Sequence, residues 1–136
     1  MGEHGYFEHD ADIGIIGMGE TVEEAFESAA TALFSIQSEL SEIRPTQTVT
    51  VDFPEEDLDY ALVTWLNKLV SLAQSRKLAL CAFRLKRTGS DWHGEADGAC
   101  WNSGMTRGVE VKGATLTGLS VKLTNHTWEA RCVVDV

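Results

Sequence analysis

Proline and cysteine are scarce in this sequence of 136 residues, which has two prolines and three cysteines. There is no proline-rich or glycine-rich linker, no low-complexity segment and no internal repeat, so we expect one domain spanning residues 1–136. The cysteines, Cys81, Cys100 and Cys132, are odd in number and have no C-x-x-C spacing. That pattern argues against a disulfide framework and a zinc site, and it is typical of reduced thiols in the cytoplasm.

Long apolar runs are also missing. No stretch of 18 apolar residues occurs, which predicts that the chain has no membrane span. The N-terminus lacks a basic start followed by an apolar segment, so we expect no signal peptide. Together these absences predict a cytoplasmic protein.

Basic residues are almost absent from the first part of the chain. The net charge is −10. Residues 1–60 contain 15 of the 21 acidic residues but only one basic residue, Arg44. An acidic surface repels phosphates, so we expect no tight, direct binding of nucleic acid. The acidic residues either keep two helices hydrated, or they attract a basic partner or cations.

Hydrophobic periodicity predicts two helices and several strands. Thr21 and Glu24 form a capping box before a helix over 22–37, and apolar residues at helical spacing predict a second helix over 57–75. Extended segments are predicted at 6–16, 46–53, 78–87, 91–96, 109–117, 119–123 and 128–134. We therefore predict an α+β fold, with a mixed, mostly antiparallel sheet and two helices packed on one of its faces.

The stretch YFEHDADIGI, at 6–15, is unusually rich in charge. Glu8, Asp10 and Asp12 would share one face of a strand, with His9 on the other. Three carboxylates repel one another unless water solvates an open edge or a cation neutralises them. Oxygen donors favour a hard cation such as Ca²⁺, Mg²⁺ or Mn²⁺. Spacing alone leaves both possibilities open.

Two further segments contain candidate residues. The chain ends in RCVVDV, where Asp135 and the carboxylate of Val136 would converge with Asp12 on one ion if the first and last strands are neighbours. Otherwise this is a frayed terminus. In VEVKGAT, at 109–115, Lys112 lies in an apolar run. It either covers apolar surface or anchors a phosphate or carboxylate.

Several segments together resemble the archease family. They are HDADIGI (9–15), GETVEEAFESAATALF (19–34), LVTWLNKLV (62–70), VKGAT (111–115) and WEARCVVDV (128–136). The resemblance implies a cytoplasmic accessory protein, not itself an enzyme, that promotes guanylylation and multiple turnover of an RtcB-type RNA ligase in tRNA splicing and RNA repair. It also implies a divalent-metal site formed by Asp12, Asp135 and Val136, and a functional lysine at Lys112.

Other functions remain open at this level. The family resemblance also suggests a chaperone or specificity modulator of a tRNA methyltransferase or another RNA-modifying enzyme. A free-standing metal-dependent hydrolase is disfavoured, because hydrolysis normally needs more ligands or an evident base. His9 would orient a carboxylate or cap the turn beside the metal site.

The sequence departs from the family pattern in two places. The family's first motif usually reads His-Thr-Ala-Asp, whereas the second position here is Asp10. The family's Lys-Ala-Val-Thr-Tyr-His corresponds to 112–117 of this chain, where Leu116 and Thr117 replace the aromatic residue and the histidine. Asp10 adds a negative charge beside the implied metal site, and the loss of the aromatic residue and the histidine is expected to mean a divergent partner.

Overall fold

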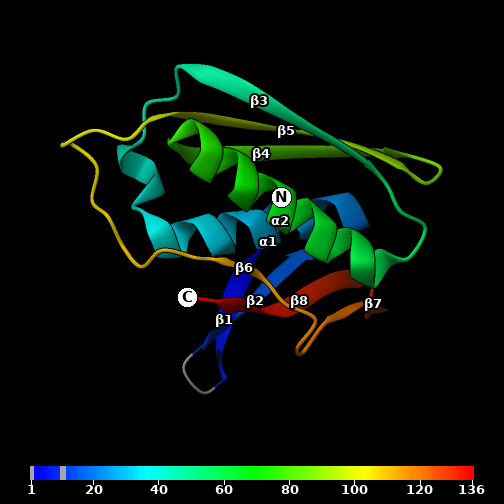
Figure 1. Cartoon of the computed structure of the whole chain (residues 1–136). Helices are drawn as coiled ribbons and strands as arrows, with labels where there is room; N and C mark the ends of the chain where they lie inside the picture. Colours follow the sequence, from blue (N-terminus) through cyan, green and yellow to red (C-terminus); the bar gives the residue numbers. More distant parts are fainter. Residues whose placement is uncertain (1, 10–11) are drawn as a thin grey trace.

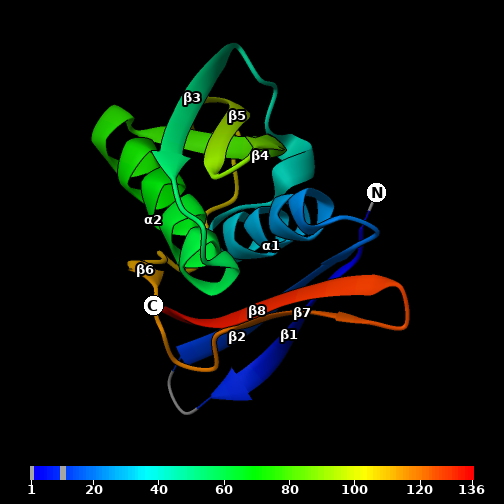
Figure 2. The ribbon, with the colours of Figure 1, turned by 90° about the vertical axis from the view of Figure 1, so that its right-hand side faces the viewer.

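Two helices lie between two antiparallel sheets in the computed structural model, which describes residues 2–9 and 12–136 (Figure 1). Figure 2, a view at right angles, shows the same three layers. The helices and strands confirm the α+β class. The strands, however, form two sheets instead of the single predicted one, so each helix contacts a sheet on two sides.

The three-stranded sheet has the order β3-β5-β4, and the five-stranded sheet has the order β1-β2-β8-β6, with β7 also pairing with β8. The three-stranded sheet consists of β3 (Gln47–Pro54), β5 (Asp91–Cys100) and β4 (Leu78–Thr88). The five-stranded sheet consists of β1 (His4–His9), β2 (Asp12–Gly19), β8 (Thr127–Asp135), β6 (Gly113–Ala114) and β7 (Ser120–Thr124). The helices are α1 (Val22–Gln37), α2 (Leu58–Arg76) and the short 3₁₀ helix η1 (Leu40–Glu42).

The helix starts are determined by local side-chain caps. Thr21 Oγ1 accepts a hydrogen bond from the Glu24 N–H at 3.1 Å, and Glu24 Oε2 accepts from the Glu20 N–H at 3.0 Å. The predicted capping box is therefore confirmed, with its second bond one residue before the cap. At the start of α2, Asp57 Oδ1 accepts from the Tyr60 N–H at 3.1 Å. The bonds from the Glu24 and Tyr60 N–H groups satisfy amides that an α-helix leaves unpaired at its N-terminus.

A common core joins the layers. Trp65 of α2 is fully buried, and its indole N–H donates to the carbonyl of Phe26 in α1 at 3.0 Å. The ring of Phe26 in turn stacks on Trp92 of β5, with centroids 5.2 Å apart. Because α1 lies between two sheets, most of its circumference is buried. No helix in the described part of the chain is long and apolar enough to cross a membrane.

Two predicted strands differ in the structure. The segment 6–16, predicted as one extended piece, forms β1 and β2, which pair antiparallel. Gly17 is inside β2, where a Cβ would lie 2.2 Å from the carbonyl oxygen of Ala25. This glycine allows α1 to approach the sheet closely. The predicted strand 109–117 is reduced to the two residues of β6, because the preceding residues run along the helix ends instead.

A tight hairpin turn connects β7 and β8. Asn125 and His126 both have left-handed backbone conformations, with φ of 51° and 65°. Two consecutive residues of this kind form the tight turn that matches the twist of an antiparallel pair. The turn places β8 beside β7, and β8 then continues toward β2 and β6.

Candidate functional site

The pairing of β2 with β8 brings the two ends of the sequence together. Ile13 is paired with Val134 in this antiparallel ladder. Asp12 and Asp135 are the next residues outward on the two strands, so both lie at the same end of the sheet. Asp12 is half-buried and Asp135 is exposed. The sequence predicted convergence of these carboxylates only if the two strands are neighbours, and the structure confirms that they are.

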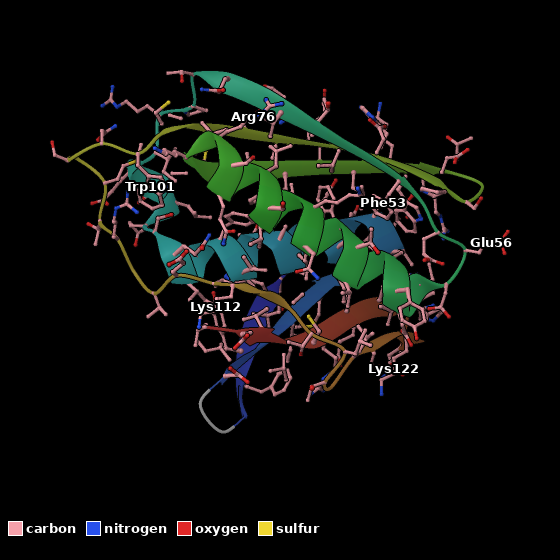
Figure 3. The ribbon with its side chains drawn as sticks, viewed as in Figure 1. Phe53, Glu56, Arg76, Trp101, Lys112 and Lys122 are labelled. Atoms are coloured by element: carbon pink, nitrogen blue, oxygen red, sulfur yellow. The ribbon has the colours of Figure 1, made fainter. Side chains whose placement is uncertain are left out.

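Lys112 directly precedes β6, the third strand at this end. Gly113 is paired with Asp135 in the β6–β8 ladder, and the Lys112 N–H donates to the carbonyl of Asp135 at 2.7 Å. The Lys112 side chain is exposed, and Figure 3 shows it beside the end of β8. We name Asp12, Lys112, Asp135 and Val136 the acid–lysine site.

The side chains of the acid–lysine site have no charged partners in the described residues. Neither Asp12, Lys112 nor Asp135 takes part in an ion pair within 2–9 and 12–136. Val136 is half-buried and packs against the main core. The site therefore presents two carboxylates and one ammonium group that are available to a ligand or a partner.

Amide side chains of both helices hold the segment before Lys112. The Val111 N–H donates to Gln37 Oε1 at 3.0 Å, and Gln74 Nε2 donates to the Val111 carbonyl at 3.4 Å. The side chain of Val111 is fully buried. Lys112 thus follows a residue that is fixed to the C-terminal ends of α1 and α2, which limits the positions its backbone can adopt.

Asn67 fixes the segment after Lys112 in the same way. Its Oδ1 accepts from the Ala114 N–H at 2.7 Å, and its Nδ2 donates to the Ala114 carbonyl at 3.1 Å. A Cβ at Gly113 would lie 2.9 Å from this Oδ1, so glycine leaves the room that Asn67 needs. In the described part of the chain, β6 has no neighbouring strand on its outer side. The side-chain amide of Asn67 makes the two backbone hydrogen bonds that such a strand would otherwise provide.

Sequence reasoning missed Gln37, Asn67 and Gln74 as positioning residues. The sequence pattern indicates only that each belongs to a helix. The single available signal is Asn67, a polar residue within the otherwise apolar run LVTWLNKLV. Nothing in the sequence connects these amides to Val111 or Ala114, because the contacts are formed only when both helices lie against the five-stranded sheet.

The positions that depart from the family pattern lie on the surface after β6. The Leu116 side chain is 58% exposed, and Thr117 is exposed as well. Their backbone is fixed to β8, since Thr115 Oγ1 donates to the Val133 carbonyl at 2.8 Å and the Val133 N–H donates to the Thr117 carbonyl at 3.0 Å. Leu116 therefore presents an apolar side chain on the same segment as Lys112.

The donors of the acid–lysine site suit a hard divalent cation by their chemistry. Asp12, Asp135 and the main-chain oxygens of Val136 offer oxygen atoms only, as Ca²⁺, Mg²⁺ and Mn²⁺ prefer. Within 2–9 and 12–136, however, no three His, Cys, Asp or Glu side chains are grouped closely enough to hold a metal. Asp10 and the side chains of Glu8 and His9 lie outside what the structure describes, so their predicted roles stay predictions.

The face predicted for Asp12 requires a correction. The sequence placed Glu8, Asp10 and Asp12 on one face of a single strand. In the structure Asp12 begins a second strand and is paired with His9 of the first. Alternation along one strand therefore does not relate Asp12 to Glu8. The carboxylate that the β2–β8 register brings to the same end of the sheet as Asp12 is Asp135, from the other end of the chain.

The chain matches known proteins over nearly its whole length. Residues 4–136 match the model of the Archease protein family (MTH1598/TM1083). A protein archease of Sulfolobus acidocaldarius is 32% identical over 134 residues, which cover 96% of each chain. The solution structure of Methanobacterium thermoautotrophicum protein 1598 superposes with a TM-score of 0.81, at 25% identity and 98% coverage of both chains. A crystal structure from Thermotoga maritima, described as an archease and possible chaperone, has a TM-score of 0.67 at 23% identity and covers 96% of this chain and 94% of that one.

Proposed function

This chain belongs to the archease family, and we propose that it is a divalent-metal-binding accessory protein of an RtcB-type RNA ligase. In this role it acts in the cytoplasm, promotes guanylylation and multiple turnover of the ligase in tRNA splicing and RNA repair, and is not itself an enzyme. The observation that supports the proposal most directly is the register of β2, β8 and β6. It brings Asp12, Asp135 and Lys112 to one exposed end of the molecule.

Asp12, Asp135 and the main-chain oxygens of Val136 would hold the metal ion. Two carboxylates at neighbouring strand ends repel each other, and a bound Ca²⁺, Mg²⁺ or Mn²⁺ would offset that repulsion and add positive charge at this end. Three donors leave other coordination positions to water or to the ligase. His9 is proposed to support the site by orienting a carboxylate.

Lys112 would contact an anionic group of the partner. Its ammonium group is exposed, while Gln37, Gln74 and Asn67 fix the backbone on both sides of it. A lysine whose backbone is fixed loses less conformational freedom on binding than one on a loose loop. Lys112 would therefore reach a phosphate or carboxylate in the ligase active site with little rearrangement of this protein.

The direct test is multiple-turnover RNA joining by an RtcB-type ligase with Mn²⁺ and GTP. We expect the parent protein to stimulate turnover and Asp12→Asn to lose that stimulation. Asp91→Asn is a matched control, because Asp91 begins β5 as Asp12 begins β2 but lies in the three-stranded sheet. Equal stimulation by parent and Asp12→Asn would remove the carboxylate from the mechanism. Stimulation by neither would refute the ligase proposal.

The metal can be measured without the ligase. Calorimetric titration with Ca²⁺ and with Mn²⁺ should show binding by the parent and by Asp91→Asn. We expect Asp12→Asn and Asp135→Asn to lose at least about tenfold in affinity, a loss that even supporting residues of metal sites produce. Unchanged affinity in both variants would contradict the assignment of these carboxylates as ligands.

A second candidate is a chaperone or specificity modulator of a tRNA methyltransferase or another RNA-modifying enzyme. The specific observation in its favour is that one solved archease structure is described as a possible chaperone. Such a role would use the surface and not the carboxylates. It predicts that parent and Asp12→Asn suppress aggregation of the methyltransferase equally during heating.

A further inference from the structure

A groove of about 710 Å³ opens where both long helices end. Its floor is formed by the buried side chains Val70, Ala73 and Leu78. Trp101, which follows β5, lies at one side, and Figure 3 shows it at the same end of the molecule as Lys112. The volume is in the range of sites that hold a small organic ligand, about 300–1,000 Å³. None of the residues of the acid–lysine site lines this groove.

The groove is positively charged in a protein whose net charge is −10. Arg76, Lys77 and Arg107 line it, with Glu110 as the single carboxylate. In the described parts of the chain, none of these three cations is within ion-pair distance of an acid. The two helix ends together amount to roughly one negative charge, which leaves the groove net positive. It therefore favours an anion.

An aromatic and a guanidinium group form one wall. The guanidinium carbon of Arg107 lies 4.0 Å from the centroid of a Trp101 ring. Trp101 is half-buried and packs on the small cluster of Ile43, Ala79, Ala99 and Met105. A guanidinium group that stacks on an indole keeps N–H donors at its edge. Indole and guanidinium planes are also the surfaces on which nucleobases stack.

The groove is largely preformed. The Gly108 N–H donates to the Gln37 carbonyl at 2.8 Å, and the Val109 N–H donates to the Ile36 carbonyl at 3.0 Å. Arg107 itself forms an isolated bridge with Ser38, the residue that caps α1. These bonds fix the segment that carries Arg107 before any ligand arrives, which lowers the entropic cost of binding.

From these features we infer that the groove binds a nucleotide, either free or as part of a single-stranded RNA. The phosphate contacts Arg76, Lys77 and Arg107, and the base stacks on the Trp101–Arg107 wall above the apolar floor. An acidic peptide would use the cations but has no planar group to cover the indole and the floor. This binding is local and of modest strength, so it is compatible with an acidic surface elsewhere. It needs neither the metal nor the ligase.

The test is a titration of the ¹⁵N-labelled full chain, followed by NMR, without metal or ligase. Three probes are compared, namely uridine monophosphate, ribose 5-phosphate and a five-residue uridine RNA. We expect shifts of the Trp101 indole N–H and the Gly108 amide, and binding of ribose 5-phosphate at least about fivefold weaker, because one stacked base contributes about 1–3 kcal/mol. A tighter complex with the RNA than with the mononucleotide would identify a strand as the ligand, and equal affinity would identify a single nucleotide.

A matched pair of variants separates the groove from general electrostatics. Arg107→Ala should weaken nucleotide binding at least about fivefold. Arg87→Ala removes the same charge from a comparable contact, since the Arg87 guanidinium lies 5.0 Å from a ring centroid of Trp92, outside the groove. We expect this variant to bind like the parent. Glu110→Gln, which removes the only carboxylate of the lining, should bind more tightly.

Three results would overturn the inference. The first is equal weakening by Arg107→Ala and Arg87→Ala, which would show attraction by overall charge. The second is tighter binding of an oligoglutamate peptide than of the nucleotide, which would make the groove a protein-docking site. The third is the absence of shifts at Trp101 and Gly108 with every probe. The NMR spectra of the free variants show whether each is folded, so loss of binding is not confused with loss of structure.

Discussion

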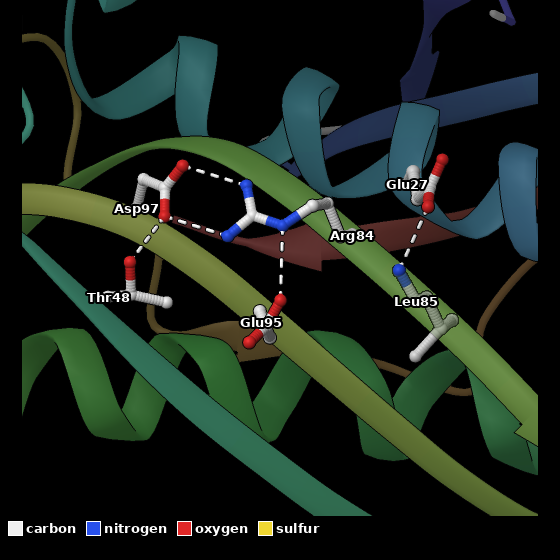
Figure 4. A network of polar contacts seen from close by, with 6 residues as sticks. All are labelled: Glu27, Thr48, Arg84, Leu85, Glu95 and Asp97. Carbon is white, nitrogen blue, oxygen red and sulfur yellow. Dashed lines mark hydrogen bonds and ion pairs between the residues drawn. The ribbon is translucent and has the colours of Figure 1, made fainter.

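In the three-stranded sheet, Arg84 donates to both oxygens of Asp97 at 2.8 and 2.9 Å and to Glu95 at 3.2 Å (Figure 4). At the end of the five-stranded sheet, Asp12, Lys112 and Asp135 have no such partners in the described part of the chain. Both sets lie near the surface, on strands or, in the case of Lys112, directly before one. The difference is that Arg84, Asp97 and Glu95 join neighbouring strands of their sheet, whereas the charges at this end of the five-stranded sheet form no ion pair in the described residues.

The edge strands β4 and β6 of the two sheets are also held by different means. β4 and β5 are joined by a long ladder, and the exposed edge of β4 is protected where Glu27 of α1 accepts from the Leu85 N–H at 2.9 Å. Burial raises the pKa of Glu27, and that hydrogen bond opposes the rise. β6 has only two ladder residues and depends on Asn67. A site assembled by side chains can be altered one residue at a time without loss of the fold.

The largest expected effect is a loss of stability that both sheets share. Trp65 is fully buried between the layers, so Trp65→Ala should lower the free energy of unfolding by about 3–5 kcal/mol through a cavity and a lost hydrogen bond. Urea denaturation followed by amide NMR signals of β5 and β8 would measure this. Tyr60→Ala, at a residue 52% exposed, is the control. Destabilisation confined to one sheet would contradict a common core.

An intermediate effect should be limited to the five-stranded sheet. Asn67→Ala removes both hydrogen bonds to Ala114 and should cost about 1–3 kcal/mol. Hydrogen exchange should become faster at the Ala114 amide and stay unchanged in β4 and β5. Lys68→Ala, at the exposed neighbouring position, should change neither the free energy of unfolding nor the exchange at Ala114. Unchanged exchange at Ala114 would show that the β8 ladder alone holds β6.

The smallest effect concerns the three-stranded sheet. The Arg84 guanidinium group lowers the pKa of Asp97 to about 2, with a further contribution from the Thr48 hydroxyl. Because the folded-state pKa is below the usual value of 3.8, the pair stabilises the protein above about pH 4, and that contribution is lost as the pH falls toward 2. The Arg84 side chain is 48% exposed, so Arg84→Ala should cost at most about 1 kcal/mol at pH 7.

Urea denaturation of parent and Arg84→Ala at pH 7 and near pH 2.5 would test the sign of this dependence. We expect the free energies of unfolding of the parent and Arg84→Ala to differ less at the lower pH. Lys86→Ala, on the same strand but outside the network, is the control for loss of charge. A difference that grows on acidification would contradict the assignment of Arg84 as the partner that lowers the pKa of Asp97.

Local patterns predicted the elements that are determined locally. The capping box at Thr21 and the apolar periodicity located α1 at its observed bounds, and the segment predicted at 46–53 forms β3, in which Val49, Val51 and Phe53 are buried. The prediction failed at 6–16 and 109–117, where alternation exists but the pairing partner decides the structure. Period-two patterns identify strands but do not determine which strands pair, so the sequence could not show that the strands form two sheets.

The sequence by itself determined the class of fold, the helices and the tight turn at Asn125–His126, because these depend on neighbours within a few residues. Only the tertiary structure decided that Asp12 lies beside Asp135, and that Gln37, Gln74 and Asn67 hold the segment around Lys112. These contacts join residues far apart in the chain. They exist because burying both faces of the helix layer brings β2, β8 and β6 together at one end of the molecule.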